Sequence, residues 1–240
     1  MSSTIRLYFP DKIQSDLSSH LTKDQTHYVK DVMRLKIEDK LSIFNTQGEW
    51  SAVIESYEKN GAKIKIMEKV RDKSNEKNIW LAFSPIKQNP LNFVVQKGTE
   101  LGVQRFIPIL SERTIVREIN IERIKKIIVE ASEQSNRISV PEISKLELLK
   151  KFLSQFPKNG YIIFCDINSH EKNLKKILSK KIEGPICILV GPEGDFSETE
   201  RQLIIALDQT CSISLAQNIL KAETAALSAV TIVNYHLNIS

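Results

Sequence analysis

The residues best suited to chemistry lie in the last fifth of the chain, in two loops that each follow an apolar strand. One strand, at 186–190, runs into Gly-Pro-Glu-Gly-Asp-Phe at 191–196, and a second, expected at 212–215, runs into the segment 216–221. A strand that ends in a Gly-Pro-x-Gly turn leaves backbone N–H and C=O groups unpaired at its carboxyl end. Ligands bind at that edge of open α/β sheets. The pattern predicts a ligand site between the two loops, although the first loop could also be only a tight turn.

A second set of polar residues lies on a helix expected from Glu122 to about Arg137. Glu130, Gln134 and Arg137 are four and three residues apart, so they form one polar stripe beside the apolar face. A solvated helix face explains this spacing. Glutamine and arginine together can also hold a phosphate or the edge of a base.

Other charged residues fall at positions where a site could use them. Lys97 and Glu100 share one side of the preceding helix, and Arg113 follows a strand at its carboxyl end. Arg6 and Arg34 belong to the β-rich N-terminal part. Spacing alone leaves the role of each of them open.

Several classes of protein are disfavoured by what the chain lacks. It has no GxGxxG, no P-loop and no GxSxG motif, and its four histidines are scattered. Its three cysteines are widely spaced, with no CxxC or Cys/His cluster, so we expect no metal site, no disulfide and a cytoplasmic location. We expect no membrane span, since no apolar run approaches 18 residues, and no signal peptide. A net charge of +5 is a weak indication of a polyanionic partner.

The elements that must position these residues divide the chain in two. Residues 1–72 read mainly as β-structure, with short strands at 41–44 and 52–54 and one helix at 22–33. Asn60-Gly61 is a hairpin turn signal between 50–57 and 62–67. Eight polar residues at 71–78 follow. We therefore expect a small β-barrel domain at 1–72 and a larger domain at 73–240.

Strands and helices alternate in the second part, which predicts a mostly parallel sheet covered by helices. The strands are expected at 79–83, 106–110, 161–165, 186–190 and 212–215. The helices are expected at 91–101, 122–137, 172–178, after a capping box at 197–200, and at 222–237.

Five ordered motifs, together with the N-terminal Arg-Leu-Tyr-Phe-Pro at 6–10, resemble the RsmE family over nearly the whole chain. The motifs are Lys-Gly-Thr-Glu-Leu-Gly-Val at 97–103, Ser-Glu-Arg at 111–113, Glu-Ala-Ser-Glu-Gln-Ser-Asn-Arg at 130–137, Gly-Pro-Glu-Gly at 191–194, and Leu215 with Ile-Leu at 219–220 and Glu-Thr-Ala at 223–225. These are bacterial 16S ribosomal RNA uridine-N3 methyltransferases of the SPOUT superfamily. The resemblance implies a PUA-like RNA-binding β-barrel, then an α/β SPOUT domain with a C-terminal trefoil knot.

The same resemblance implies S-adenosyl-L-methionine as cofactor, N3 of a uridine in 16S rRNA of the small ribosomal subunit as target, and a homodimer. It places the cofactor against nine residues of the two loops and their strands: Leu189, Gly191, Glu193, Gly194, Leu215, Ala216, Asn218, Ile219 and Leu220. The candidate catalytic residues are Arg113, Gln134, Arg137 and Glu223, of which Glu223 either orders the loop or receives a proton. The candidate RNA contacts are Arg6, Arg34 and Lys97.

The second loop departs from the family pattern, in which glycine, arginine, arginine and threonine stand where this chain has Ala216, Asn218, Lys221 and Ala222. Alanine at 216 is tolerable unless the backbone needs positive φ. Lys221 keeps the charge but loses the planar fork of arginine, and Asn218 loses the charge. Two alternatives stay open. A SPOUT ribose 2′-O-methyltransferase would share the fold and the cofactor, and the departures at Ala216 and Asn218 would suit a non-catalytic RNA-binding or ribosome-assembly factor.

Overall fold

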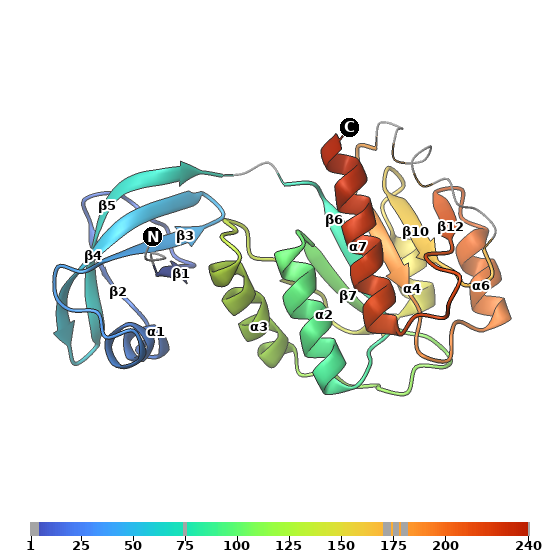
Figure 1. Ribbon diagram of the computed structural model, residues 1–240, viewed down its shortest axis with the longest axis horizontal. Coiled ribbons are helices and arrows are strands. Elements are labelled where there is room, and N and C mark those ends of the chain that lie inside the picture. The colour runs from blue at the N-terminus through green and yellow to red at the C-terminus, as the bar shows by residue number, and fades with distance from the viewer. Residues whose placement is uncertain (1–4, 74–75, 170–173, 175–177, 179–181, 240) are drawn as a thin grey trace. The chain divides into compact units, whose positions relative to one another are not determined.

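The computed structural model describes residues 5–73, 76–169, 174, 178 and 182–239 (Figure 1). The chain forms two compact units. The first consists of residues 1–75 with 132–140, and the second of 76–131 with 141–240. The sequence does not predict that the short segment 132–140 groups with the N-terminal residues. The domain boundary after residue 72 stays a prediction.

The first unit is built on a five-stranded mixed sheet in the order β1-β3-β4-β5-β2. Its strands are β1 (Arg6–Tyr8), β2 (Ser18–His20), β3 (Lys40–Asn45), β4 (Gly48–Glu58) and β5 (Gly61–Asp72). β1 pairs with β3 in parallel, and the other neighbours are antiparallel. The Asn60-Gly61 hairpin is confirmed, since β4 and β5 join there and Gly61 has a φ of +138°. Closure of the sheet into a barrel stays a prediction.

The single helix expected at 22–33 is two joined turns of different kinds. α1 (Lys23–His27) begins at a capping box in which Thr22 and Gln25 exchange hydrogen bonds. A π-helical turn, η1 (Tyr28–Val32), continues it. The buried core beneath these elements includes Val29, Leu41 and Ile64.

The second unit contains a seven-stranded parallel sheet in the order β12-β10-β11-β6-β7-β8, with β9 paired to β7. Its strands are β6 (Ile79–Phe83), β7 (Arg105–Leu110), β8 (Glu142–Ile143), β9 (Glu147–Leu148), β10 (Tyr161–Cys165), β11 (Ile186–Val190) and β12 (Thr210–Ile213). β11 is buried along its whole length, as its apolar sequence predicts. The parallel sheet predicted from the alternating pattern is confirmed.

Helices cover this sheet. They are α2 (Gln88–Glu100), α4 (Leu149–Gln155), α6 (Glu198–Ile205) and α7 (Ala222–Ile239). The helix α3 (Ile121–Gln134) begins in the second unit and ends in the first, since the division between the units falls after Ala131. α4 and α6 share a core with strand residues such as Ile162 and Leu189. α7 packs against β6, β11 and α2, and Figure 1 shows α2 and α7 side by side. None of the described helices is long and apolar enough to cross a membrane.

Two element boundaries expected from the sequence need correction, and one expected helix lies mostly outside the residues that the structure describes. α3 ends at Gln134 rather than near Arg137, because Asn136 adopts a left-handed conformation with a φ of 63°. β12 covers 210–213, so Ser214 and Leu215 already belong to the following loop. The helix expected at 172–178 lies mostly outside the described residues. The fold class of a mostly parallel sheet preceded by a small β-rich unit is confirmed, whereas the trefoil knot stays a prediction.

Candidate active site

A cavity of about 520 Å³ lies at the carboxyl ends of β10, β11 and β12. These strands are neighbours and parallel, so the loops that follow them leave the sheet at one edge. The two C-terminal loops meet there as predicted, since Pro192 and Asn218 both line the cavity. Its volume falls within the range of roughly 300–1,000 Å³ that is typical of small-molecule sites.

Most of the residues predicted to hold a ligand line this cavity. They are Gly191, Glu193, Leu215, Ala216, Asn218, Ile219 and Leu220, together with the candidate catalytic residue Glu223. Two others lie elsewhere. Leu189 is fully buried in the core shared with α4 and α6, and Gly194 is exposed in the first loop beside Arg113. The ligand-binding role of these residues stays a prediction.

The first loop is a tight turn whose geometry depends on its two last residues. The Asp195 N–H donates to Pro192 O at 2.9 Å, and Asp195 has a φ of 58°. Phe196 is buried and packs edge-on against Phe164, with ring centroids 5.5 Å apart. A Cβ added at Gly191 would lie 3.0 Å from the Phe196 ring. A side chain at position 191 would therefore require the Phe196 ring to move by a few tenths of an ångström.

The second loop presents apolar side chains to solvent at the cavity. Ile219 is 84% exposed and lines the cavity. Single exposed apolar residues are common on protein surfaces, so its place on the cavity wall, rather than its exposure, makes it a candidate ligand contact. Ala216 is not among the described residues with positive φ, so the loss of the family's glycine costs no backbone strain here.

A buried carboxylate on α6 ties the first loop to the segment that carries Arg113. Glu200 belongs to the predicted capping box, which is confirmed: its Oε2 accepts from the Ser197 N–H, and Ser197 Oγ accepts from the Glu200 N–H. Its other oxygen, Oε1, accepts from the Glu112 N–H at 2.8 Å. Arg113 Nη1 then donates to Gly194 O at 2.9 Å. The candidate catalytic arginine is thereby held beside the first loop.

Sequence reasoning missed Asp166, which follows β10 and lines the cavity. This carboxylate is 1% exposed and accepts from Arg201 Nε at 3.0 Å and from Nη2 at 2.9 Å. The sequence could have indicated Asp166 as a site residue, because it directly follows the apolar strand at 161–165. Cys165 also lines the cavity, and burial raises the pKa of its thiol to about 12. This residue is therefore a protonated thiol at neutral pH.

The remaining candidates have different surroundings. Gln134 is exposed at the end of α3, and Arg137 is buried with its Nη2 donating to Ser139 Oγ. Both belong to the first unit, whereas Arg113 and Glu223 belong to the second, so a catalytic site common to all four stays a prediction. Lys97 donates to both carboxylate oxygens of Glu100.

Arg34, a candidate RNA contact, is exposed and has a φ of 57°. Arg6, the other RNA contact predicted in the first unit, has a side chain that is 10% exposed and forms an ion pair with Glu49. Its role as an RNA contact stays a prediction.

Comparison with known proteins gives consistent matches. The model of an RNA methyltransferase domain matches residues 73–234, and that of an RNA methyltransferase PUA domain matches 21–67. The ribosomal RNA small subunit methyltransferase E of Rickettsia conorii is 36% identical over 94% of this chain and 93% of its own length. The enzyme of that name from Neisseria gonorrhoeae, solved with S-adenosylmethionine, is 28% identical with a TM-score of 0.86 over 97% of both chains. A Legionella pneumophila protein, also solved with that cofactor, is 26% identical with a TM-score of 0.86 and the same coverage of both chains.

Proposed function

Because the chain belongs to the ribosomal RNA small subunit methyltransferase E family of RNA methyltransferases, we propose that it methylates N3 of a specific uridine in 16S rRNA, using S-adenosylmethionine. The observation that carries this proposal is the cavity that the two C-terminal loops share. The relative from Neisseria gonorrhoeae, with a closely similar fold, was solved with this cofactor.

The residues of the cavity fit S-adenosylmethionine. Leu215, Ile219 and Leu220 supply apolar walls for the adenine ring. Lys87 and Glu223 are lining residues of opposite charge, as the zwitterionic methionine part requires. When bound there, S-adenosylmethionine would supply an electrophilic methyl group for N3 of the uridine, and the N3 proton would pass to Glu223 or to water.

The residues of this chain contribute mainly by positioning. Holding two reactants in line lowers a barrier by roughly 7–11 kcal/mol in favourable cases. N3 lies on the Watson–Crick edge, so the uridine must be unpaired or extruded, at a cost of about a few kcal/mol. We assign Arg113, Gln134 and Arg137 to holding the RNA near the methyl group. We assign Glu223 to ordering the cofactor loop or to receiving the proton.

The finer features form part of the same proposal. Arg34 and Lys97 contact the RNA backbone, the substrate is the small ribosomal subunit, and the enzyme works in the cytoplasm. The C-terminal segment forms a trefoil knot, and two copies associate through α7. Its exposed Tyr235 and Ile232 are suitable contacts for a symmetric mate.

A methylation assay tests the function directly. The purified protein is incubated with S-adenosylmethionine and with either naked 16S rRNA or small subunits, and the modified nucleoside is identified by mass spectrometry. We expect N3-methyluridine. A ribose 2′-O-methylated product would replace the proposal with its SPOUT alternative. Absence of cofactor binding by calorimetry would favour the non-catalytic alternative.

A further inference from the structure

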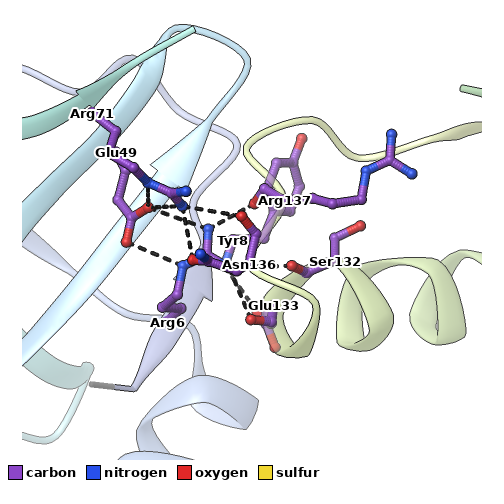
Figure 2. A network of polar contacts seen from close by, with 8 residues as sticks. All are labelled: Arg6, Tyr8, Glu49, Arg71, Ser132, Glu133, Asn136 and Arg137. Carbon is purple, nitrogen blue, oxygen red and sulfur yellow. Dashed lines mark hydrogen bonds and ion pairs between the residues drawn. The ribbon is translucent and has the colours of Figure 1, made fainter. Parts of the chain in front are cut away.

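In the first unit, two arginines share one buried carboxylate (Figure 2). Glu49 on β4 is 4% exposed. Arg6 on β1 donates from Nε to Glu49 Oε1 at 3.1 Å and from Nη2 to Oε2 at 3.3 Å. Arg71 on β5 donates from Nε to Glu49 Oε2 at 2.7 Å. Three strands thus contribute to one charged cluster.

Both arginines also donate hydrogen bonds to backbone oxygens of the segment 132–137, where α3 ends. Arg6 Nη1 donates to Glu133 O at 2.9 Å and to Ser132 O at 3.3 Å, and its Nη2 donates to Arg137 O at 2.6 Å. Arg71 Nη2 donates to the backbone oxygen of Asn136 and to its Oδ1. The last carbonyls of a helix have no partner within the helix. Arg6 therefore satisfies the Glu133 carbonyl and shares the Ser132 carbonyl with the Arg137 N–H, while Arg71 holds the Asn136 backbone just beyond the helix. Both cations complement the helix dipole.

The contacts of Arg6 fully occupy its side chain. A guanidinium has five N–H donors, and Arg6 makes hydrogen bonds to Glu49, Ser132, Glu133 and Arg137 from all three of its nitrogens. Its guanidinium carbon also lies 4.4 Å from the centroid of the Phe44 ring. With the side chain only 10% exposed, it has no donor to offer a phosphate group.

We propose that Arg6, Glu49 and Arg71 form a clamp that fixes where α3 ends and thereby orients Gln134 and Arg137, and that Arg6 is a positioning residue rather than an RNA contact. The proposal rests on the proposed function, because it assumes that Gln134 and Arg137 act on the RNA. Figure 2 shows the Arg137 guanidinium pointing away from Glu49 and Arg6, so the clamp holds its backbone and leaves its side chain outside the cluster.

The charge of Glu49 is the centre of the clamp. Burial opposes its ionisation, but the hydrogen bonds and charges of Arg6 and Arg71 outweigh burial and hold its pKa below the ordinary value. Without this carboxylate, the two guanidinium groups would face each other with no shared anion. Replacement of Glu49 by the isosteric glutamine should therefore loosen both arginines from the 132–137 backbone.

The test compares Glu49→Gln, Arg6→Gln and the double variant with Glu68→Gln. The last is a matched control, since Glu68 is an exposed residue of the same unit and its replacement makes the same charge change. Hydrogen exchange of the 132–137 amides reports the clamp without any catalysis. We expect each single variant to speed this exchange at least tenfold, and the double variant to add little, because the two residues act together.

Kinetics then separate positioning from RNA contact. We expect Glu49→Gln and Arg6→Gln both to lower kcat by about 10- to 100-fold, the usual effect of misplaced reactive groups, with the affinity for S-adenosylmethionine unchanged. An RNA contact would behave differently. Arg6→Gln would then lower the salt dependence of RNA binding by about one ion, whereas Glu49→Gln, which removes a negative charge, would strengthen RNA binding. That pair of opposite results would overturn the proposal.

A milder variant covers the case in which Glu49→Gln does not fold. Arg71 is 36% exposed, and Arg71→Lys keeps its charge but loses the planar fork. Faster exchange at 136–137 in this variant supports the clamp, and unchanged exchange refutes it. A wild-type protein without methyltransferase activity would refute the proposed function, while the exchange data would still decide on the clamp.

Discussion

Replacement of Gly191 by alanine should weaken cofactor binding, because the added methyl group would press against the ring of Phe196. It would lie 3.0 and 3.1 Å from two carbons of the Phe196 ring and 3.5 Å from Asp195 Oδ1. Phe196 is 4% exposed and is backed by Phe164, so the ring cannot turn away freely. The strain must be relieved by a shift of the loop at 191–196 or of the core behind it.

The size of the effect follows from the cost of overpacking, which is typically about 1–3 kcal/mol. If the loop absorbs all of it, the Kd for S-adenosylmethionine rises about 5- to 140-fold, at about 1.4 kcal/mol for each factor of ten. If the core absorbs it, the free energy of unfolding falls by the same amount instead. The loss of binding free energy and the loss of unfolding free energy should therefore add up to the overpacking energy of about 1–3 kcal/mol.

Gly194→Ala is the matched control. Its added methyl group would lie 3.6 Å from Arg113 Cβ, an ordinary contact, and Gly194 is not among the described glycines with positive φ. Because no neighbour has to move, we expect its Tm to match that of the wild type, and any rise in its Kd reports the predicted contact of Gly194 with the cofactor rather than packing strain. Isothermal titration calorimetry and thermal unfolding provide the measurements. A Gly191→Ala protein with wild-type Kd and wild-type Tm would show that the packing argument is wrong.

Three further predictions concern titratable groups. Asp166→Asn removes the buried carboxylate that pairs with Arg201, so it should lower the free energy of unfolding by about 3 kcal/mol. Urea titration measures this quantity, and a loss below about 1 kcal/mol would contradict the prediction. Cys165, whose pKa is raised to about 12 by burial, should react with iodoacetamide at pH 8 far more slowly than an unperturbed thiol; labelling at an ordinary rate would contradict the raised pKa. Glu49 has a lowered pKa, so its contribution to stability is present above the ordinary value of 4.5 and is lost as the pH falls through the lower folded-state value. Unfolding measured between pH 7 and pH 3 should therefore show a smaller acid loss for Glu49→Gln than for wild type, and identical curves would refute the assignment.

Much of the fold was predictable from local patterns. The hairpin at Asn60-Gly61, the capping box at Ser197 and the buried strand β11 each depend on residues close in sequence. The meeting of the two C-terminal loops was predictable as well, because parallel neighbouring strands end at one edge of a sheet.

The rest depends on contacts between distant residues, which no local pattern encodes. The end of α3 is held by Arg6 and Arg71, which lie more than 60 residues before it in the sequence. Glu200 reads as a capping residue, and nothing near it indicates a bond to the Glu112 amide. The two glycines of the first loop look alike in the motif, and only the position of Phe196 distinguishes their tolerance of a side chain.

The grouping of residues 132–140 with the N-terminal strands has a practical consequence for anyone who wants the small domain by itself. A gene truncated at the apparent boundary would encode strands whose Arg6 and Arg71 have lost their backbone acceptors on Arg137 and Asn136, just beyond the end of α3. An expression plasmid for this domain should instead encode residues 1–75, a flexible linker and residues 132–140. The domain would then contain both parts of the first unit.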